Sequence, residues 1–549
     1  MNRSIFIILT MFSFSSIAQQ SADTSKSTKT PSTYKPKSTT IKAQNNSVSQ
    51  MKQFAKEDNI SADNSFKNQD YTLALALYLD ELSKKPEDND LRVKIGQCYL
   101  ETDIKKSNAI DYFEYALAHD YKNNEIALFL GRAYLYAERF DDAITKFEQF
   151  KNLEYKHPEN VAKAEKFLKY ANTGKQLKAK ALNVTLTNMG DIINSTKMDN
   201  MPIIDLSESN LYFNTNRNFM QEYGEYTWDI NVSEFKGNKW KKSHSLSSKI
   251  NTIDNEFLVG TSPNVDNLII RPETYISSGD LQYCPLINKK FDTPLPFTAT
   301  INGEKQIETT GCFSASGDTL YFASTREGGY GGLDLYYSIK LGNDWSIPQN
   351  LGPNINTPEN EDYPNIMKDG KTLYFASEGH EGMGGYDLFT SVFDNQKQEW
   401  SSPQNIGYPL NTTYDDLNIS FAANPRYAYV SQVKDEGMGE FDIYRVVFND
   451  IEAPITTITG RIAVGDTTTA KPLLELSQKN TIKIFDKKTE MVFGEYQLNK
   501  DSRYVFALPP GSYYLKIESD VMDTFKKNIN IPDKQPDNTV ITSDIYIKH

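Results

Sequence analysis

The sequence has few of the residues that build metal centres and covalent crosslinks. Its three cysteines, Cys98, Cys284 and Cys312, permit at most one disulfide, and their spacing fits no zinc site. The five histidines are scattered, and no two have the spacing of metal ligands on one helix or hairpin. We therefore expect buried structural thiols, whose disulfide state the sequence leaves open, and no histidine metal centre.

The sequence also lacks the motifs of common catalytic sites. It contains no G-x-S-x-G elbow, no H-E-x-x-H, no P-loop and no sustained dinucleotide fingerprint. We therefore predict neither an enzyme nor a cofactor. Lysine and arginine total 59 against 72 acidic residues, a net charge of -13, and the part expected to fold has no long basic stretch. This balance argues against extensive nucleic-acid binding.

Long apolar runs are absent except at the N-terminus. Arg3, an apolar run from Ile5 to Phe14 and a small-residue site ending at Ala18 predict a secretory signal over residues 1–18. No later stretch offers the roughly 20 apolar residues of a transmembrane helix, and no cysteine for a lipid anchor follows Ala18. Residues 19–50, rich in Ser, Thr, Lys and Pro, predict a disordered linker. We expect an exported, periplasmic protein.

Residues 51–178 have helical periodicity and an internal repeat. Gly96 and Tyr99 recur 35 positions later as Gly131 and Tyr134, and a terminal capping helix follows. The pattern resembles the tetratricopeptide repeat, in which small residues let paired helices approach closely. The resemblance implies a short all-α superhelix with a peptide on its concave face. The alternative is that these helices only space other domains.

Residues 182–450 switch to alternating strands and repeat every 53 residues, as Tyr321, Tyr374 and Tyr427. Each unit contains a hairpin, a strand such as LYFAS, a glycine-rich loop and a strand that begins at an acid, and two units add a tryptophan strand. The recurring acids and tryptophans are Asp334, Asp387, Asp442, Trp345 and Trp400. Short strands repeated in this way predict an all-β propeller with five blades, or alternatively six. Residues 182–187 are expected to complete the last blade.

The strings LYFAS, GGxDLY and NxGxxxNT resemble the TolB-type, WD-like propeller repeats of bacterial envelope proteins. Their glycine loop could suggest a phosphate cradle, but no helix N-terminus follows it. The third copy has Glu440 where the others have glycine. We favour a turn whose aspartate accepts backbone N–H groups.

A second repeated element, such as Ile355-Asn356-Thr357, precedes the first strand of most units and is followed by acidic residues. If these acids ringed one mouth of the central channel, they could hold Ca²⁺ or attract a basic peptide. We favour the alternative that they cap turns and face water. The candidate acids are Asp254, Glu308, Glu361, Asp362, Asp415 and Asp416.

Residues 455–549 form a last unit of alternating strands, with a turn at Pro509-Pro510-Gly511. The run from Val505 to Tyr514 is similar to the carboxypeptidase-regulatory-like domain, which implies an all-β, prealbumin-like sandwich.

The order of modules resembles periplasmic OmpA-family-like proteins of Bacteroidetes that are associated with type IX secretion and gliding. The resemblance implies a non-enzymatic scaffold or adaptor that binds envelope proteins such as an outer-membrane barrel. The OmpA-like domain of that family is missing here, so contact with peptidoglycan is in doubt. The alternatives are a glycan- or peptidoglycan-binding module, for which the four tryptophans are candidates, and a propeller hydrolase.

Overall fold

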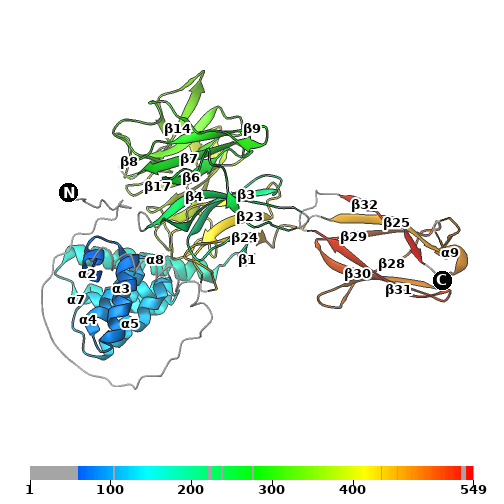
Figure 1. Cartoon of the computed structure of the whole chain (residues 1–549), viewed down its shortest axis with the longest axis horizontal. Coiled ribbons are helices and arrows are strands. Elements are labelled where there is room, and N and C mark those ends of the chain that lie inside the picture. The colour runs from blue at the N-terminus through cyan, green and yellow to red at the C-terminus, as the bar shows by residue number, and fades with distance from the viewer. Residues whose placement is uncertain are drawn as a thin grey trace. The chain divides into compact units, whose positions relative to one another are not determined.

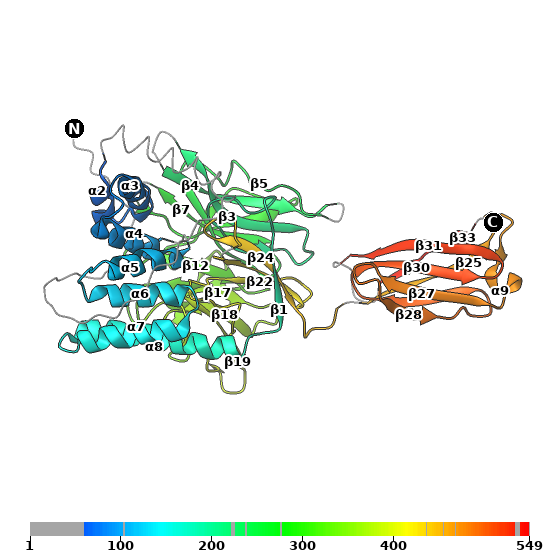
Figure 2. The same ribbon diagram turned by 90° about the horizontal axis from the view of Figure 1, so that it is seen from below.

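The computed structural model describes residues 60–102, 105–220, 225–236, 239–274, 277–434, 436–453, 455–466, 468–532 and 539–547. The predicted secretory signal and linker lie outside the described residues. The chain divides into two compact units, the first consisting mainly of residues up to 447 and the second mainly of residues 448–549 (Figures 1 and 2).

The first unit begins with a layer of helices that pack as successive pairs. Their bounds are α2 Ala62–Lys67, α3 Tyr71–Lys84, α4 Asn89–Glu101, the 3₁₀ turn η1 Lys106–Asn108, α5 Ala109–Ala118, α6 Glu125–Tyr136, α7 Phe140–Leu153 and α8 Pro158–Ala179. Asp70 caps α3 by accepting the Leu73 N–H group. Gly131 on α6 lies against Phe147 on α7, where a Cβ atom would come within 2.6 Å of the ring. Gly96 is packed in the same way against Phe113.

The strands of the first unit form five antiparallel sheets, which we call blades 1 to 5. Blade 1 consists of β2 Asp199–Ile204, β3 Asn210–Met220, β4 Glu225–Glu234 and β5 His244–Ser245, and blade 2 consists of β6 Asn255–Thr261, β7 Asn267–Thr274, β8 Ser277–Ser278, β9 Gln282–Ile287, β10 Lys290–Phe291 and β11 Leu295–Pro296. Blade 3 consists of β12 Glu308–Phe313, β13 Thr319–Ser324, β14 Asp334–Leu341, β15 Asp344–Trp345 and β16 Gln349–Asn350, and blade 4 consists of β17 Glu361–Ile366, β18 Thr372–Ser377, β19 Asp387–Asp394, β20 Glu399–Trp400 and β21 Gln404–Asn405. Blade 5 consists of β22 Ile419–Phe421, β23 Tyr427–Gln432, β24 Asp442–Phe448 and β1 Val184–Asn188. β1 precedes blade 1 in the chain but pairs with β24, as expected for the segment at 182–187.

Contacts between neighbouring blades join them in a β-propeller-like ring. The backbones of Gly260 in blade 2 and Gly311 in blade 3 lie so close that a Cβ atom on Gly260 would collide with the Gly311 carbonyl. Side-chain hydrogen bonds make the other four links. The donor and acceptor residues of those links are Asn214 and Leu258, Thr310 and Asp362, Asn365 and Ile419, and Ile204 and Ser420.

The predicted fold class of three separate domains, beginning with an all-α tetratricopeptide superhelix, is wrong. The described residues are mostly β, and the helices belong to the same compact unit as the blades. The physical reason is a shared core: Met383 of blade 4 is fully buried among helical residues that include Phe140 and Tyr170. Tyr408, from the loop after β21, packs against the same cluster. Figure 2 shows the helices stacked in a layer alongside the strands.

The second unit consists of two sheets around a single core. One contains β25 Thr456–Val464, β26 Lys471–Pro472, β29 Arg503–Leu508, β32 Val540–Thr542 and β33 Ile545–Ile547; the other has the order β28 Val492–Tyr496, β27 Asn480–Asp486, β30 Gly511–Ser519, β31 Met522–Ile531. A short helix, α9 Leu473–Leu476, follows β26. Alternate residues of β30, Tyr513, Leu515 and Ile517, point into the core, so the residues between them form the outer face of that sheet.

The cysteines and the helices of the described residues bear on two predictions from the sequence. Cys98, Cys284 and Cys312 are all buried and unpaired, and burial raises the pKa of each thiol to about 12. Among the described helices, none is long and apolar enough to cross a membrane.

Candidate functional site

The glycine loops of blades 3, 4 and 5 are turns held by an aspartate. Asp334 accepts the Tyr330 and Gly331 N–H groups at 2.6 and 3.1 Å. Asp387 accepts the two corresponding groups of its own loop at 2.9 Å each, and Asp442 does so at 2.5 and 3.2 Å. Burial raises the pKa of Asp387 to about 7, even though its backbone hydrogen bonds lower it. The loops are therefore structural turns of the blades, and each aspartate carboxylate is hydrogen-bonded to the backbone of its own loop.

Glu440, which replaces a glycine in the third loop, has a separate contact. Its carboxylate lies 3.9 Å from the ammonium group of Lys197, which is also 4.0 Å from the ring centroid of Tyr226. Lys197 is buried, and burial lowers its pKa. The change in the third loop thus supplies a carboxylate to a buried lysine between blades 5 and 1.

The asparagines of the second repeated element clamp the preceding blade. Asn356 accepts the Leu335 N–H group at 2.8 Å and donates to the Leu335 carbonyl at 3.0 Å. The same two-way contact recurs in three other blade connections. The pairs that make it are Asn251 with Ile230, Asn411 with Leu388 and Asn194 with Ile443.

Three of the six candidate acids, Glu308, Glu361 and Asp416, accept hydrogen bonds from within their own blade or its entry turn. Glu361 accepts the Thr357 N–H group at 2.6 Å and the Ser377 hydroxyl at 2.7 Å. Burial raises its pKa to about 7. Asp416 accepts the Thr412 N–H group at 2.5 Å, and burial raises its pKa well above the usual value.

The other candidate acids do not converge with these three. Asp362 is bound by the hydroxyls of Thr309 and Thr310, exposed Asp415 accepts the Tyr386 N–H group at 3.0 Å, and Asp254 is half-buried in its turn. Within the described residues, no group of three or more His, Cys, Asp or Glu side chains could hold a metal ion. The acids are therefore distributed one or two to a blade and do not form a ring of facing carboxylates.

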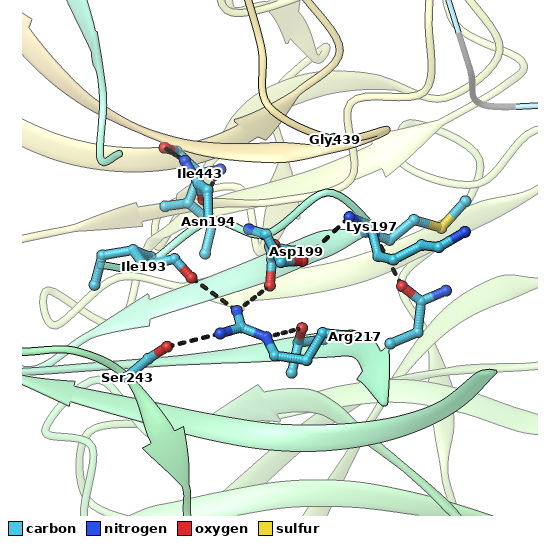
Figure 3. Close-up of polar contacts among 12 residues, drawn as sticks. Ile193, Asn194, Lys197, Asp199, Arg217, Ser243, Gly439 and Ile443 are labelled. Carbon is cyan, nitrogen blue, oxygen red and sulfur yellow. Dashed lines mark hydrogen bonds and ion pairs between the residues drawn. The ribbon is translucent and has the colours of Figure 1, made fainter. Parts of the chain in front are cut away.

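Arginine–carboxylate pairs tie the first strands of blades 1 and 3 to their entry turns. Figure 3 shows Arg217 between Asp199, at 2.6 Å, and the Ile193 carbonyl, at 2.8 Å, with Ser243 accepting at 3.0 Å. Asp199 has no exposed surface. The guanidinium thus joins a strand, a turn and the neighbouring loop.

Blade 3 repeats this arrangement, and blade 4 replaces the arginine with a histidine. Arg326 donates to Glu308 at 3.1 Å and to the Ile301 carbonyl at 2.8 Å. In blade 4 the His380 Nε2 atom lies 2.8 Å from the Ile355 carbonyl, which corresponds to the carbonyl of Ile301. His380 is half-buried, and burial lowers its pKa. It is therefore part of the blade.

Two of the four tryptophans are buried between blades and two are half-buried. Trp345 and Trp400 are buried in the cores between blades 2 and 3 and between blades 3 and 4. Trp240 packs against the core between blades 5 and 1. Trp228 on β4 is half-buried, with its ring 5.3 Å from that of Phe257.

A cleft of about 550 Å³ lies between α8 and blades 3 and 4. Its walls combine the apolar groups of Leu177, Pro353, Phe389 and Pro403 with neutral amides and hydroxyls. The remaining lining residues are Thr173, Gln176, Asn354, His380, Glu381, Ser402 and Asn405. Apolar walls with a few placed polar groups are typical of ligand and peptide sites.

The walls of the cleft are held together from both sides. The Thr173 hydroxyl donates to Glu381 at 3.3 Å, Asn405 donates to the Glu381 carbonyl at 3.2 Å, and Asn354 donates to the Trp400 carbonyl at 2.8 Å. Near the end of α8, the Tyr408 hydroxyl donates to Glu138 at 3.1 Å. These contacts join helix and blade, so the cleft is part of one packed unit.

Comparisons with known proteins assign no family. No family model matches the chain, and no curated protein matches it. A solved α-L-arabinofuranosidase from Podospora anserina in complex with cellotriose is 12% identical with a TM-score of 0.30, over 48% of this chain and 93% of that chain. A protein of unknown function from Dyadobacter fermentans is 9% identical with a TM-score of 0.30, over 48% and 99%. A putative 6-phosphogluconolactonase from Bacteroides uniformis is 11% identical with a TM-score of 0.25, over 60% and 84%. Similarities this low carry no argument about activity.

Sequence reasoning missed the cleft residues almost entirely. Gln176 lies in the predicted capping helix, and Asn354 and Ser402 lie in loops that the repeat pattern assigns to turns. His380 is the one residue with a signal, because it stands three positions after the end of the second strand of blade 4, and blade 3 carries Arg326 two positions after the end of its own second strand.

Proposed function

We propose that this chain is a non-enzymatic, periplasmic scaffold that binds an extended peptide segment of a partner protein in the cleft between α8 and blade 4. The cleft is the observation that supports this function. Its neutral amides on Gln176 and Asn354 can form hydrogen bonds with a peptide backbone, while Leu177 and Pro403 offer apolar contact.

The predicted export signal and the resemblance of the strand repeats to envelope propellers support a partner in the cell envelope. An outer-membrane barrel or a component of a secretion or gliding machine fits that setting. The resemblance now rests on the propeller and the C-terminal strands, because the tetratricopeptide part of it is wrong.

Hydrolysis in this cleft has little support from its lining. A retaining or inverting glycosidase places two carboxyl groups on either side of the bond that it cleaves. Glu381 is the one carboxylate among the residues that line the cleft. Assays with chromogenic glycosides and peptides test this directly. Turnover that a Glu381→Gln substitution abolishes would show that the protein is an enzyme and would contradict the scaffold proposal.

The test of the scaffold is affinity purification of the tagged protein from its native envelope, with cross-linking and mass spectrometry. We expect an envelope protein to be recovered with cross-links to residues beside the cleft. The double variant Gln176→Arg, Ser402→Trp fills the cleft from two exposed positions and is expected to lose that partner while its melting temperature is unchanged. Lys180→Ala, at the exposed end of α8, is the control.

Recovery of the same partners by the filled variant would contradict the scaffold proposal. Recovery of glycan fragments alone would favour the second candidate, a glycan-binding protein. Half-buried Trp228 and Phe257, with Arg271 5.8 Å from the Phe257 ring, are the observation that supports it. Binding of peptidoglycan fragments that Trp228→Leu abolishes would establish this second function.

A further inference from the structure

The outer face of the β28-β27-β30-β31 sheet in the second unit carries a row of three lysines. Lys483 on β27 lies directly opposite Lys516 on β30, and Lys516 lies directly opposite Lys526 on β31. Like charges in directly opposed positions destabilise a sheet. A ligand anion on this face would offset part of that repulsion.

The three lysines differ in how they are neutralised. Lys483 is paired with Glu495 at 3.3 Å, and Lys516 with Glu518 at 2.6 Å. Among the described residues no carboxylate forms an ion pair with Lys526. Its ammonium lies 5.5 Å from the ring centroid of Tyr514. The cation at this end of the row is therefore available to a ligand.

An aromatic pair lies beside the lysine row. The rings of Phe485 and Tyr514 stack with centroids 4.9 Å apart and planes 5° from parallel. Phe485 covers the β27 side of Tyr514, and Asn528 is the partner of Tyr514 on the β31 side. The Tyr514 hydroxyl donates to Glu490 at 2.9 Å, which orients the ring.

Beside Tyr514 lies a cavity of about 250 Å³ lined by Glu490, Tyr514, Lys526 and Asn528. It combines an aromatic ring, an ammonium group without an ion pair among the described residues, an amide that can both donate and accept, and a carboxylate that accepts the Tyr514 hydroxyl through one oxygen. An apolar ring face with hydroxyls at its edges and one acidic group is the chemistry of an acidic sugar.

We propose that this cavity binds a saccharide that carries a carboxylate, of the uronate type. The sugar ring stacks on Tyr514, its carboxylate pairs with Lys526, and its hydroxyls bond to Asn528 and Glu490. This site lies in the second unit and is independent of the cleft in the first.

The test is titration of the full-length protein with tetragalacturonate and, separately, with its neutral methyl ester, by calorimetry at low salt. We expect the acid to bind more tightly than the ester, and this preference to disappear at high ionic strength. Lys526→Gln is expected to weaken binding of the acid about two- to fivefold and to leave the ester unchanged, as for an exposed ion pair. Tyr514→Leu is expected to weaken both.

Lys483→Gln is the matched control, because it removes a lysine from the same row that is already ion-paired. It is expected to leave both affinities unchanged. The proposal is overturned if neither saccharide binds at millimolar concentration, if acid and ester bind equally, or if Lys526→Gln and Lys483→Gln have the same effect. The Gln176→Arg, Ser402→Trp variant is expected to bind the saccharide normally, which separates this site from the cleft.

Discussion

At the scale of single residues, burial controls the chemistry of the carboxylates in the blades. Glu361 and Asp387 are fully buried, accept two or more hydrogen bonds each, and have pKa values raised to about 7. Desolvation of the buried carboxylates outweighs these hydrogen bonds. Glu361, one of the candidate acids for a binding ring, and Asp387, the aspartate of a glycine loop, are thus pH-sensitive parts of the core.

A pH dependence of stability follows for Glu361. Its pKa of about 7 in the folded state lies above the value of 4.5 for an ordinary glutamate. The stability that it contributes is therefore fully present below about pH 4.5 and is lost as the pH rises through about 7, by about 3 kcal/mol at most. We expect the melting temperature of the first unit, followed by tryptophan fluorescence, to fall between pH 5 and pH 8.

Glu361→Gln is expected to reduce this slope, because the neutral amide can accept the Thr357 N–H group and carries no charge at pH 8. Glu359→Gln, an exposed position in the same segment, is the control. An unchanged slope in Glu361→Gln would show that other groups cause the pH dependence.

Close packing of glycine gives a second prediction at this scale. In Gly131→Ala the new Cβ atom would lie 2.6 Å from the Phe147 ring. Overpacking of this kind costs about 1–3 kcal/mol, against the roughly 1 kcal/mol by which alanine favours a helix. We expect a lower midpoint of urea unfolding, partly restored by Phe147→Leu. A higher midpoint would mean that the helices can separate without loss, and Glu148→Ala at an exposed position of α7 is the control.

At the scale of the elements, each blade is closed by contacts between its first strand and the turn that leads into it. Arg217 joins Asp199 to the Ile193 carbonyl in blade 1, and His380 reaches the equivalent carbonyl in blade 4. The blades therefore use different side chains for one structural task.

Arg217→Ala is expected to destabilise the first unit by about 3–5 kcal/mol, because it leaves the carboxylate of Asp199 buried and unpaired. The double variant Arg217→Met, Asp199→Asn is expected to be more stable than the single variant. Chemical denaturation measures both. Lys236→Ala, which breaks the exposed pair with Glu234, is expected to change stability by less than about 1 kcal/mol. Equal losses for the two alanine variants would contradict the role of Arg217.

At the scale of the whole molecule, the helices and the propeller-like ring share one core in the first unit. Met383 of blade 4 is fully buried, and Gly174 of α8 approaches both it and Phe140. Helices that bury apolar surface against the blades are stabilised by them, and we expect the two to unfold together.

Met383→Ala tests this coupling. Loss of a buried methionine costs about 2–5 kcal/mol, and hydrogen exchange should then accelerate in α8 as well as in blade 4. Met491→Ala, at an exposed position in the second unit, is expected to change neither. Faster exchange confined to blade 4 would show that the helices fold independently.

Patterns that are local in the sequence led to local structure. The glycine loop followed by Asp334 contains its own donors and acceptor within five residues, so the turn could be read directly from the sequence. The strand repeat also predicted the pairing of β1, which begins at Val184. This strand precedes the first complete blade in the sequence and was expected to complete the last one.

The surroundings of the acidic side chains were predicted less well. Their spacing before each first strand was visible, but whether Glu361 or Asp362 faces a channel or a hydroxyl depends on side-chain direction in a bulged strand. A one-residue irregularity reverses that direction, and nothing in the sequence marks it.

By itself the sequence determined the repeating strands, the turns and the close helix pairs, because each depends on residues a few positions to some 35 apart that recur with the repeat. Only the tertiary structure decided that the helices join the blades in one unit and that a cleft lies between them. Those features depend on contacts such as that of Thr173 with Glu381, which lie 208 positions apart. No periodicity links such residues, and the free energy of burying apolar surface in the folded chain selects the pairs that meet.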